Sequence, residues 1–261
     1  MRKELPTPQY YTVDLNIHFL QRQMKHPNLR LTGNGGIFQK PLAMQGDRLP
    51  VIKRCQPNMI DFMQWGWKPE FYVNSPLYNR QPLLYIKGEA LNTYYQPYML
   101  QPQQHRCIVI ANSFFAWHFK EHERAPDRKR GKWVKHEFRS PKNIFLLFAG
   151  LYGLNANEKQ NRLHFSIVSK PAIPSLLHYM KRMPLILEGN DLSIWLTGSI
   201  DDCLGLVEYV EPPNFIISHM DFLLGDDEYY KRETFEQFYH TEREDWNDLD
   251  EKKLKREKFK H

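Results

Sequence analysis

Runs of apolar and polar positions along the chain predict a mixture of strands and short helices. Three segments are rich in β-branched and aromatic residues and are separated by loops with proline, glycine and charged residues. We expect strands over residues 106–117, 144–152 and 163–169. Because these strands do not alternate regularly with helices, the pattern favours an α+β fold.

Apolar residues at mixed helical spacing predict three helices. We expect them over residues 14–25, after a candidate cap at Asp14, over 172–181, and over 190–197, where Asn190 or Asp191 can cap the first turn. Each is short, so the strands should provide most of the core.

The end of the chain has a different character. The last forty residues mix opposite charges at i, i+4 spacing with scattered aromatic residues. We therefore expect one domain over residues 1–221 and a charged, helical tail over 222–261.

Composition is that of an ordinary soluble protein. The 261 residues are 41% hydrophobic and 14% aromatic, which is enough for a sizeable core. No apolar run approaches the roughly 20 residues that span a bilayer, and the first residues contain no apolar signal-peptide region. We expect a cytoplasmic protein with no membrane association. The three cysteines, Cys55, Cys107 and Cys203, lack zinc-ligand spacing, so neither a disulfide nor a cysteine–zinc site is indicated, and no cofactor is expected.

Positive charge is concentrated in the body of the chain. The net charge is +6, and residues 222–261 contain 9 Lys/Arg and 12 Asp/Glu. The tail therefore carries about −3 and the rest about +9. A basic body fits an anionic partner such as nucleic acid, although solvated lysines would give the same count.

The stretch His118 to His122 contains H-x-x-E-H, the ligand spacing of inverted zinc peptidases. In those enzymes the two histidines lie one helical turn apart and face one metal ion. Here the stretch continues an apolar, aromatic segment that reads as a strand, on which residues i and i+4 are roughly 13 Å apart. We therefore expect no metal site.

Five stretches in order resemble the SRAP family, the SOS response-associated peptidases. The family patterns are approximately W-G-L-I-P-x-W, R-C-[LI]-[IV]-P-A-[DS]-G-F-[FY]-E-W, F-A-G-L-[YW], [TS]-I-[VI]-T-x-x-A and a histidine followed by R-M-P-[VL]-I-L. The corresponding stretches here are WGWKPEF (65–71), RCIVIANSFFAW (106–117), FAGLY (148–152), FSIVSKPA (165–172) and HYMKRMPLIL (178–187). The resemblance implies a mixed, barrel-like β-sheet core with flanking helices.

The resemblance also implies a covalent chemistry at abasic sites in single-stranded DNA. In the family, a cysteine at position 2 offers its amine and thiol to the ring-opened aldehyde and closes a thiazolidine. An asparagine of an N-A-R-x-E-T motif, the glutamate of F-[FY]-E-W and the histidine before R-M-P assist, while the arginines of N-A-R and R-M-P hold phosphates.

This sequence departs from the family pattern at positions that the covalent chemistry requires. Position 2 is Arg2, which has no thiol. In YIKGEALNTYYQP (85–97), Lys87 stands for the asparagine and Gly88 for the alanine, while Glu89 stands for the arginine and Leu91 for the glutamate. An anion at 89 should repel a phosphate backbone.

The glutamate of the F-[FY]-E-W motif is also missing. Its position is taken by Ala116, which has no proton to give or take. We therefore expect no thiazolidine. A lysine at 87 could in principle form a reversible imine with an aldehyde.

Several positions remain that match the family pattern. His178 is the candidate for the retained catalytic histidine, although it also suits a helix surface. Arg182 fits the phosphate contact of R-M-P, or an ordinary structural turn. Ser169 stands where the family has a hydroxyl near the lesion. Three tryptophans are candidates for base stacking, with burial in the core as the alternative: Trp65, Trp67 and Trp117.

The leading hypothesis is a degenerate SRAP-like protein that binds single-stranded or abasic-site DNA without forming the crosslink. A first alternative is an active crosslinking SRAP protein, with associated autopeptidase activity, whose catalytic residues have been relocated. A second is a protein-interaction module that reuses the fold through the tail and the segment 119–139. The motifs do not name a physiological protein partner or an oligomeric state.

Overall fold

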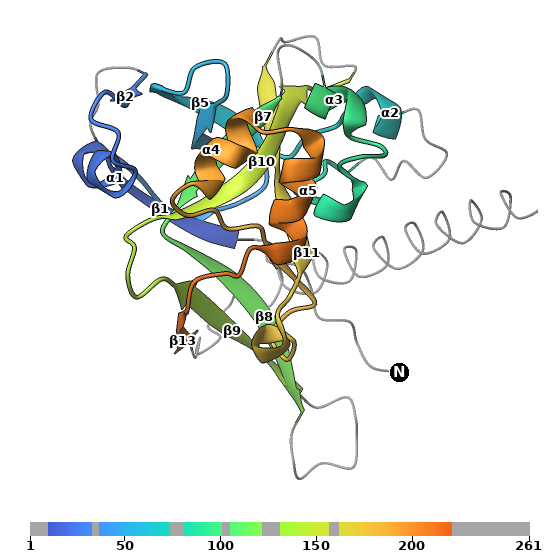
Figure 1. Cartoon of the computed structure of the whole chain (residues 1–261). Helices are drawn as coiled ribbons and strands as arrows, with labels where there is room; N and C mark the ends of the chain where they lie inside the picture. The colour runs from blue at the N-terminus through green and yellow to red at the C-terminus, as the bar shows by residue number, and fades with distance from the viewer. Residues whose placement is uncertain are drawn as a thin grey trace, which may run out of the picture.

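A closed barrel lies at the centre of the part of the chain that the computed structural model describes, residues 10–32, 37–73, 81–100, 105–121, 131–156 and 162–220. The larger sheet has the order β12-β11-β10-β7-β4-β5-β2, with β6 beside β11, and β5 also pairs with β11. Five strands, from β11 round to β5, therefore close on themselves (Figure 1). The strands are β2 (Arg30–Leu31), β4 (Arg48–Lys53), β5 (Met59–Trp65), β6 (Tyr85–Lys87), β7 (Arg106–Ala111), β10 (Leu146–Leu154), β11 (Leu163–Pro171) and β12 (Arg182–Pro184).

A second, antiparallel sheet packs beside the barrel, in the order β13-β9-β8-β1-β3. Its strands are β1 (Tyr10–Asn16), β3 (Ile37–Ala43), β8 (Ser113–Glu121), β9 (Gly131–Arg139) and β13 (Ile216–Met220). Edge-to-face contacts between aromatic rings join the two sheets. The ring centroid of Tyr11 lies 4.9 Å from that of Trp65 and 6.0 Å from that of Phe148. Such contacts between large buried rings add to the stability that burial gives.

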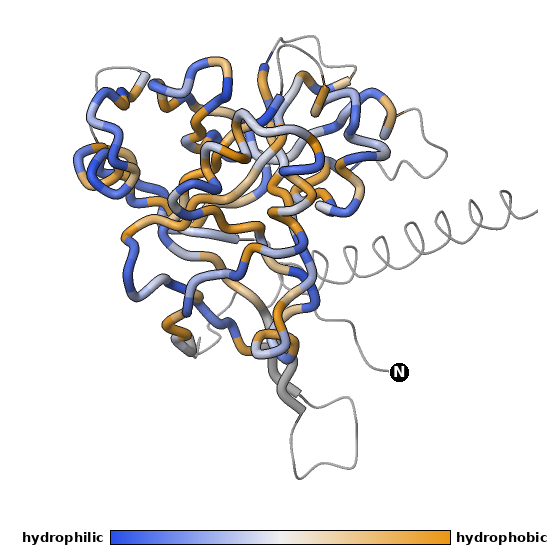
Figure 2. Tube along the Cα trace, viewed as in Figure 1, coloured by the Kyte–Doolittle hydropathy of each residue, from blue (hydrophilic) through white to orange (hydrophobic). Residues whose placement is uncertain are grey.

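Helices flank the barrel: α1 (Ile17–Gln23), α2 (Glu70–Val73), α3 (Gln96–Leu100), α4 (Asp191–Thr197) and α5 (Ile200–Tyr209), with the 3-10 turns η1 (Gly88–Ala90) and η2 (Pro174–Leu176). In Figure 1, α4 and α5 lie over β7, β10 and β11. Hydrophobic segments gather along the central strands in Figure 2, and hydrophilic ones follow the peripheral turns. Strand β7 is buried along its whole length because it lies between barrel neighbours, helices and the core.

The predicted α+β class with a mixed, barrel-like core is confirmed, and so are strands in all three predicted segments. The segment 106–117 is divided between β7 and β8, which belong to different sheets. The helix predicted over 190–197 is α4, with Asn190 at its N-cap position. The SRAP resemblance implies one sheet, whereas the structure has two.

Two helix predictions need correction. Residues 14–16 belong to β1, and helix α1 begins only after Asn16, whose side chain accepts a hydrogen bond from the His18 amide. The predicted helix over 172–181 is absent because β11 continues to Pro171 and only the short turn η2 follows. Proline removes the amide donor and fixes φ, so Pro171 and Pro174 favour an extended exit and a tight turn.

Within the segment 119–139, residues 122–130 lie outside the described part of the structure, and the rest belongs to two strands. Strand β8 runs to Glu121 and β9 starts at Gly131, and the two pair along this length. The predicted tail over 222–261 and Arg2 lie outside the described residues. None of the helices in the described ranges is long and apolar enough to cross a membrane.

Gly153 packs so closely against Trp67 that a side chain at position 153 should destabilise the protein. A Cβ atom at Gly153 would lie 2.9 Å from the Trp67 ring, which is buried and donates from Nε1 to the Leu154 carbonyl. We expect Gly153→Ala to lower the free energy of unfolding by about 1–3 kcal/mol because the ring has no room to move. Urea denaturation measures this. The control is Gly205→Ala in α5, where an added Cβ meets nothing within 4 Å, and a gain of about 0.5–1 kcal/mol is expected. Equal stability of Gly153→Ala and the unaltered protein would contradict this packing.

Candidate functional site

Strand β11 brings the degraded motif segments together. Its end pairs in parallel with β6, with Ser169 opposite Lys87, and antiparallel with β12, with Ser169 opposite Pro184. The segment that resembles N-A-R-x-E-T and the segment that contains R-M-P therefore lie on opposite edges of one strand. The end of β11 extends beyond the barrel, so both of its edges can pair with other strands. Residues about 95 positions apart in sequence meet there.

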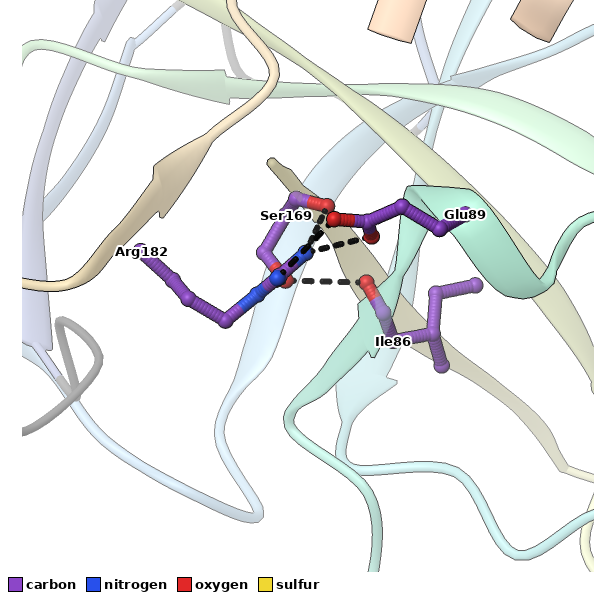
Figure 3. Close-up of polar contacts among 4 residues, drawn as sticks. All are labelled: Ile86, Glu89, Ser169 and Arg182. Carbon is purple, nitrogen blue, oxygen red and sulfur yellow. Dashed lines mark hydrogen bonds and ion pairs between the residues drawn. The ribbon is translucent and has the colours of Figure 1, made fainter. Parts of the chain in front are cut away.

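Arg182 lies at the centre of a network that joins these three segments (Figure 3). Its Nε donates to Ser169 Oγ at 3.1 Å, and one terminal nitrogen donates to the Ser169 carbonyl at 2.8 Å. The two terminal nitrogens also donate to both carboxylate oxygens of Glu89, at 3.1 and 2.7 Å. This is the two-pronged geometry that guanidinium groups form with carboxylates or phosphates.

The network leaves Arg182 little capacity for another anion. A guanidinium has five N–H donors, and the four hydrogen bonds to Ser169 and Glu89 occupy four of them. Sequence analysis expected Arg182 to contact phosphate and Glu89 to repel it. The structure shows a direct contact between the two residues: both terminal nitrogens of Arg182 donate to Glu89.

The carboxyl of Glu89 responds to two opposing influences. Partial burial opposes its ionisation, but the hydrogen bonds and charge of Arg182, with a contribution from Lys87, outweigh burial and lower its pKa. The carboxylate is therefore charged at neutral pH. Its side chain is 48% exposed, so solvent screens the pair and its effect on stability is small.

The Gly88 position is fitted to helix α5. A Cβ atom there would lie 2.7 Å from both methyl carbons of Val207, a residue of α5. The family alanine therefore does not fit in this chain without a shift of the helix. Lys87, at the family asparagine position, ends β6 and precedes η1, and its charge lies close enough to affect Glu89.

Ala116 lies in β8 and is buried, opposite His136 of β9. The His136 ring is also buried and packs edge-on against Tyr179, with 4.7 Å between ring centroids. A methyl group at 116 can neither donate nor accept a proton. At this position the acid–base group of the family pattern has become part of the packing between β8 and β9.

His178 lies in the turn before β12 rather than on a helix. Its ring is exposed and lies tilted against the ring of the adjacent Tyr179, which also contacts the rings of His136 and Phe138. The turn thus brings His178 to the side of β9 that also contains the partner of Ala116. Whether it keeps a catalytic role stays a prediction.

The side chains of Ser169, Trp65 and Trp67 make contacts within the protein core. The Ser169 hydroxyl is buried and donates to the Ile86 carbonyl, which fastens β6 to β11. Trp65 and Trp67 are fully buried, and their Nε1 groups donate to the carbonyls of Leu84 and Leu154. No ring face is left for a base, so both belong to the core. The side chain of Trp117 lies outside the described part of the structure.

Sequence reasoning did not find three contributors to this region: Glu89 as a partner of Arg182, and the ring pair His136 and Tyr179. No local signal marks them, because each contact joins segments more than 40 residues apart. For the H-x-x-E-H stretch, the expected strand is confirmed through Glu121, while His122 falls outside the described residues. No cluster of metal-ligating side chains occurs within the described ranges.

A family model described as SOS response associated peptidase (SRAP) matches residues 20–218. The chain belongs to the SRAP family. It is thus an SRAP protein of a family associated with the SOS response to DNA damage. The match includes every described residue of the Arg182 network. No curated protein matches the chain.

Solved structures share the fold of this SRAP domain. A phage-related protein from Bordetella bronchiseptica is 17% identical with a TM-score of 0.57, covering 81% of this chain and 94% of the other. A second B. bronchiseptica protein is 15% identical with a TM-score of 0.60, over 81% and 99% of the two chains. A Bacteroides thetaiotaomicron protein is 18% identical with a TM-score of 0.55, over 76% and 85%. At these identities the likeness concerns the fold alone.

The opposing influences on Glu89 predict how its titration depends on Arg182. In Arg182→Gln the hydrogen-bonding charge is gone and burial remains, so the pKa of Glu89 should rise from below the ordinary glutamate value towards or above it. In the unaltered protein, the pair's stabilisation is present above the unfolded pKa and is lost as pH falls through the lowered pKa. Carboxyl carbon chemical shifts followed by NMR between pH 2 and 7 measure this. Arg22→Gln, in α1, is the control, and an unchanged Glu89 titration in Arg182→Gln would contradict the pairing.

Proposed function

We propose that this SRAP protein is a degenerate member that binds single-stranded or abasic-site DNA without forming the covalent crosslink. The observation that carries the proposal is the occupation of Arg182 by Glu89. An internal carboxylate takes the place of a phosphate, so any DNA phosphate must compete with it. Binding is then weaker than in a site with a free arginine.

Loss of the chemistry rests on three positions. Arg2 has no thiol to trap an imine, and Ala116 is a buried methyl group opposite His136. At 87 a lysine stands for the amide of the family pattern. Each change removes a group that must donate or accept a proton or an electron pair, so assistance to ring closure is lost together with the nucleophile.

Retained DNA binding is supported by charge. The body carries about +9, and the carboxylate of Glu89 is surrounded by Arg182, Lys87 and Lys170. Lys170 is buried and donates to the Val210 carbonyl at 2.7 Å; burial lowers its pKa, and the charges of Glu211 and then Glu89 oppose this. Three cations near two carboxylates, Glu89 and Glu211, leave one positive charge in excess, which attracts a polyanion.

The proposal predicts that removing the internal carboxylate strengthens DNA binding. Fluorescence anisotropy of a labelled single-stranded oligonucleotide, across a salt series, should show salt-sensitive binding by the unaltered protein. Glu89→Gln should bind more tightly, with a slope of log K against log salt that is steeper by about 0.7–1, because Arg182 gains a phosphate.

The matched control is Glu188→Gln, an exposed acid with the same change in charge that lies outside the network. It should raise affinity only by its general charge effect. The DNA-binding proposal is lost if neither the unaltered protein nor Glu89→Gln binds at low salt. Equal gains in the two variants would show that Arg182 does not contact phosphate.

A second prediction concerns covalent chemistry. An oligonucleotide with an abasic site, incubated with the protein and resolved under denaturing conditions, should show no adduct, either directly or after borohydride reduction. An adduct that survives denaturation without reduction would favour an active enzyme with relocated residues. An adduct that appears only after reduction and disappears in Lys87→Arg would assign imine formation to Lys87.

A further inference from the structure

Helix α1 carries a ridge of exposed side chains that are aromatic or basic. Its buried residues, Ile17 and Leu20, lie on one side of the helix. At about 100° per residue, His18, Phe19 and Arg22 lie together on the other side, and all three are exposed. Phe19 is 43% exposed, and the Arg22 guanidinium lies 5.7 Å from the centre of its ring. In Figure 1, α1 lies at the rim of the molecule.

Two glutamines hold a turn on each side of this ridge. The Gln21 side chain donates to the carbonyls of Pro27 and Leu29, at 3.2 and 2.8 Å. On the other flank, the Gln23 side chain donates to the Phe145 carbonyl at 2.8 Å and accepts from the Phe145 amide at 3.0 Å. The turn after α1 and the turn before β10 are therefore fixed beside the helix.

These turns extend the ridge into a basic patch. Arg30 follows the first turn, and Lys142 and Ile144 lie in the second. Glu188, whose carboxylate accepts from Asn143 at 2.7 Å, brings one negative charge to the second turn. We define the α1 patch by its exposed members: Phe19, Arg22, Lys25, Arg30, Lys142 and Ile144.

The sequence around α1 contains no acidic residue that could offset these cations. Residues 15–46 hold four Lys/Arg and no Asp/Glu, whereas the chain average of 30 acidic residues in 261 would place about four in a segment of 32. Arg22, Lys25 and Arg30 form no ion pair with a described residue. The end of a helix contributes a partial negative charge of about half a unit, which is too small to balance three cations.

The combination of cations with an exposed ring favours single-stranded nucleic acid as the partner. Cations bind the phosphates of a strand, and unpaired bases stack on aromatic side chains. A duplex keeps its bases paired and out of reach of Phe19. An acidic peptide matches the charge of the patch but offers no regular series of planar rings.

The α1 patch lies at the end of the barrel that also contains Arg182. Strands β10 and β11 are antiparallel, so the start of β10 lies at the same end as the last residues of β11. Gln23 binds Phe145, directly before β10, and Arg182 pairs with Pro171, the last residue of β11. A strand of DNA that contacts both places would therefore cross a single end of the barrel.

We propose that the α1 patch is a second contact surface for single-stranded DNA. Phe19 stacks on a base, while Arg22, Lys25 and Arg30 bind the adjacent phosphates. The guanidinium of Arg22 lies beside the ring, so stacking and charge act together within one helical turn. This role rests on the proposed function, because it extends the path of the strand whose phosphate competes with Glu89 for Arg182.

Fluorescence anisotropy of a labelled single-stranded oligonucleotide tests the patch. Phe19→Ala should weaken binding by about tenfold or more because a stacking ring is lost. Phe19→Tyr keeps an aromatic face and should bind within about twofold of the unaltered protein. Arg22→Gln should reduce the slope of log K against log salt by about 0.7, the effect of one lost phosphate contact on a single strand.

The matched control for Arg22→Gln is Arg48→Gln, which removes the same charge from another exposed arginine. Arg48 pairs near the end of β5, whereas Arg30 pairs at its start, so the control lies away from the patch. It should change the slope by less than half as much. Circular dichroism of each variant confirms that folded proteins are compared.

Photocrosslinking provides a direct readout of the contact. A strand that contains 5-iodouracil, irradiated with the protein and analysed by mass spectrometry after digestion, should give an adduct on the peptide that contains Phe19. Phe19→Ala should lose this adduct. Adducts confined to peptides outside the α1 patch would overturn the proposal.

The binding results separate this proposal from the proposed function. If Glu89→Gln strengthens binding while Phe19→Ala and Arg22→Gln match the unaltered protein and Arg48→Gln respectively, the patch is overturned and DNA binding at Arg182 stands. If no variant binds at low salt, both fail. Weaker binding of Arg22→Gln to phosphatidylserine vesicles, with unchanged DNA binding, would assign the patch to a lipid surface and overturn the nucleic-acid assignment.

Discussion

The pairing of β11 on both of its edges is the interaction on which barrel and site depend. Its first half lies antiparallel to β10 and parallel to β5, which closes the barrel, and its second half holds β6 and β12. The hydroxyls of Ser166 and Ser169 donate to the carbonyls of Leu83 and Ile86, at 2.6 and 3.0 Å. These bonds fasten the segment before η1 along one strand, because buried backbone acceptors need partners. The position of Glu89 is thus fixed by the same strand that closes the barrel.

Arg182 is held by contacts within the protein. Two of its four hydrogen bonds go to Ser169. These two bonds hold β12 against β11 independently of the partner that the other two donors bind. The remaining donors bind Glu89, so the guanidinium is satisfied without DNA. The R-M-P stretch therefore has a structural role in this fold, because its arginine joins β12 to β11.

The sequence predicted the elements whose signal is local. In four segments the spacing of apolar residues matches the repeat of the predicted element, and each segment forms that element. They are the strands around 106–117, 144–152 and 163–169 and the helix at 190–197. The helix predicted from Asp14 begins only at Ile17, because residues 14–16 pair with β3 and this backbone pairing outweighs the helical spacing of the apolar residues. Tryptophans beside glycine and proline could be read as surface or core, and only the three-dimensional packing assigns Trp65 and Trp67 to the core. The contact between Glu89 and Arg182 had no local signal because it spans 93 residues.

The substitutions from the family pattern leave the region around Glu89 no more acidic than that pattern. Relative to the family pattern, the lysine at 87 adds one positive charge and the glutamate at 89 removes two units. Ala116 and Leu91 each remove a negative charge, so the four positions together are slightly more positive than before. Proton transfer requires a particular group at a particular atom, whereas attraction of a polyanion depends on summed charge. A site can therefore lose the first property and keep the second. The carboxylate of Glu89 forms an ion pair with Arg182. Its negative charge is therefore neutralised locally and does not repel an anion elsewhere on the surface.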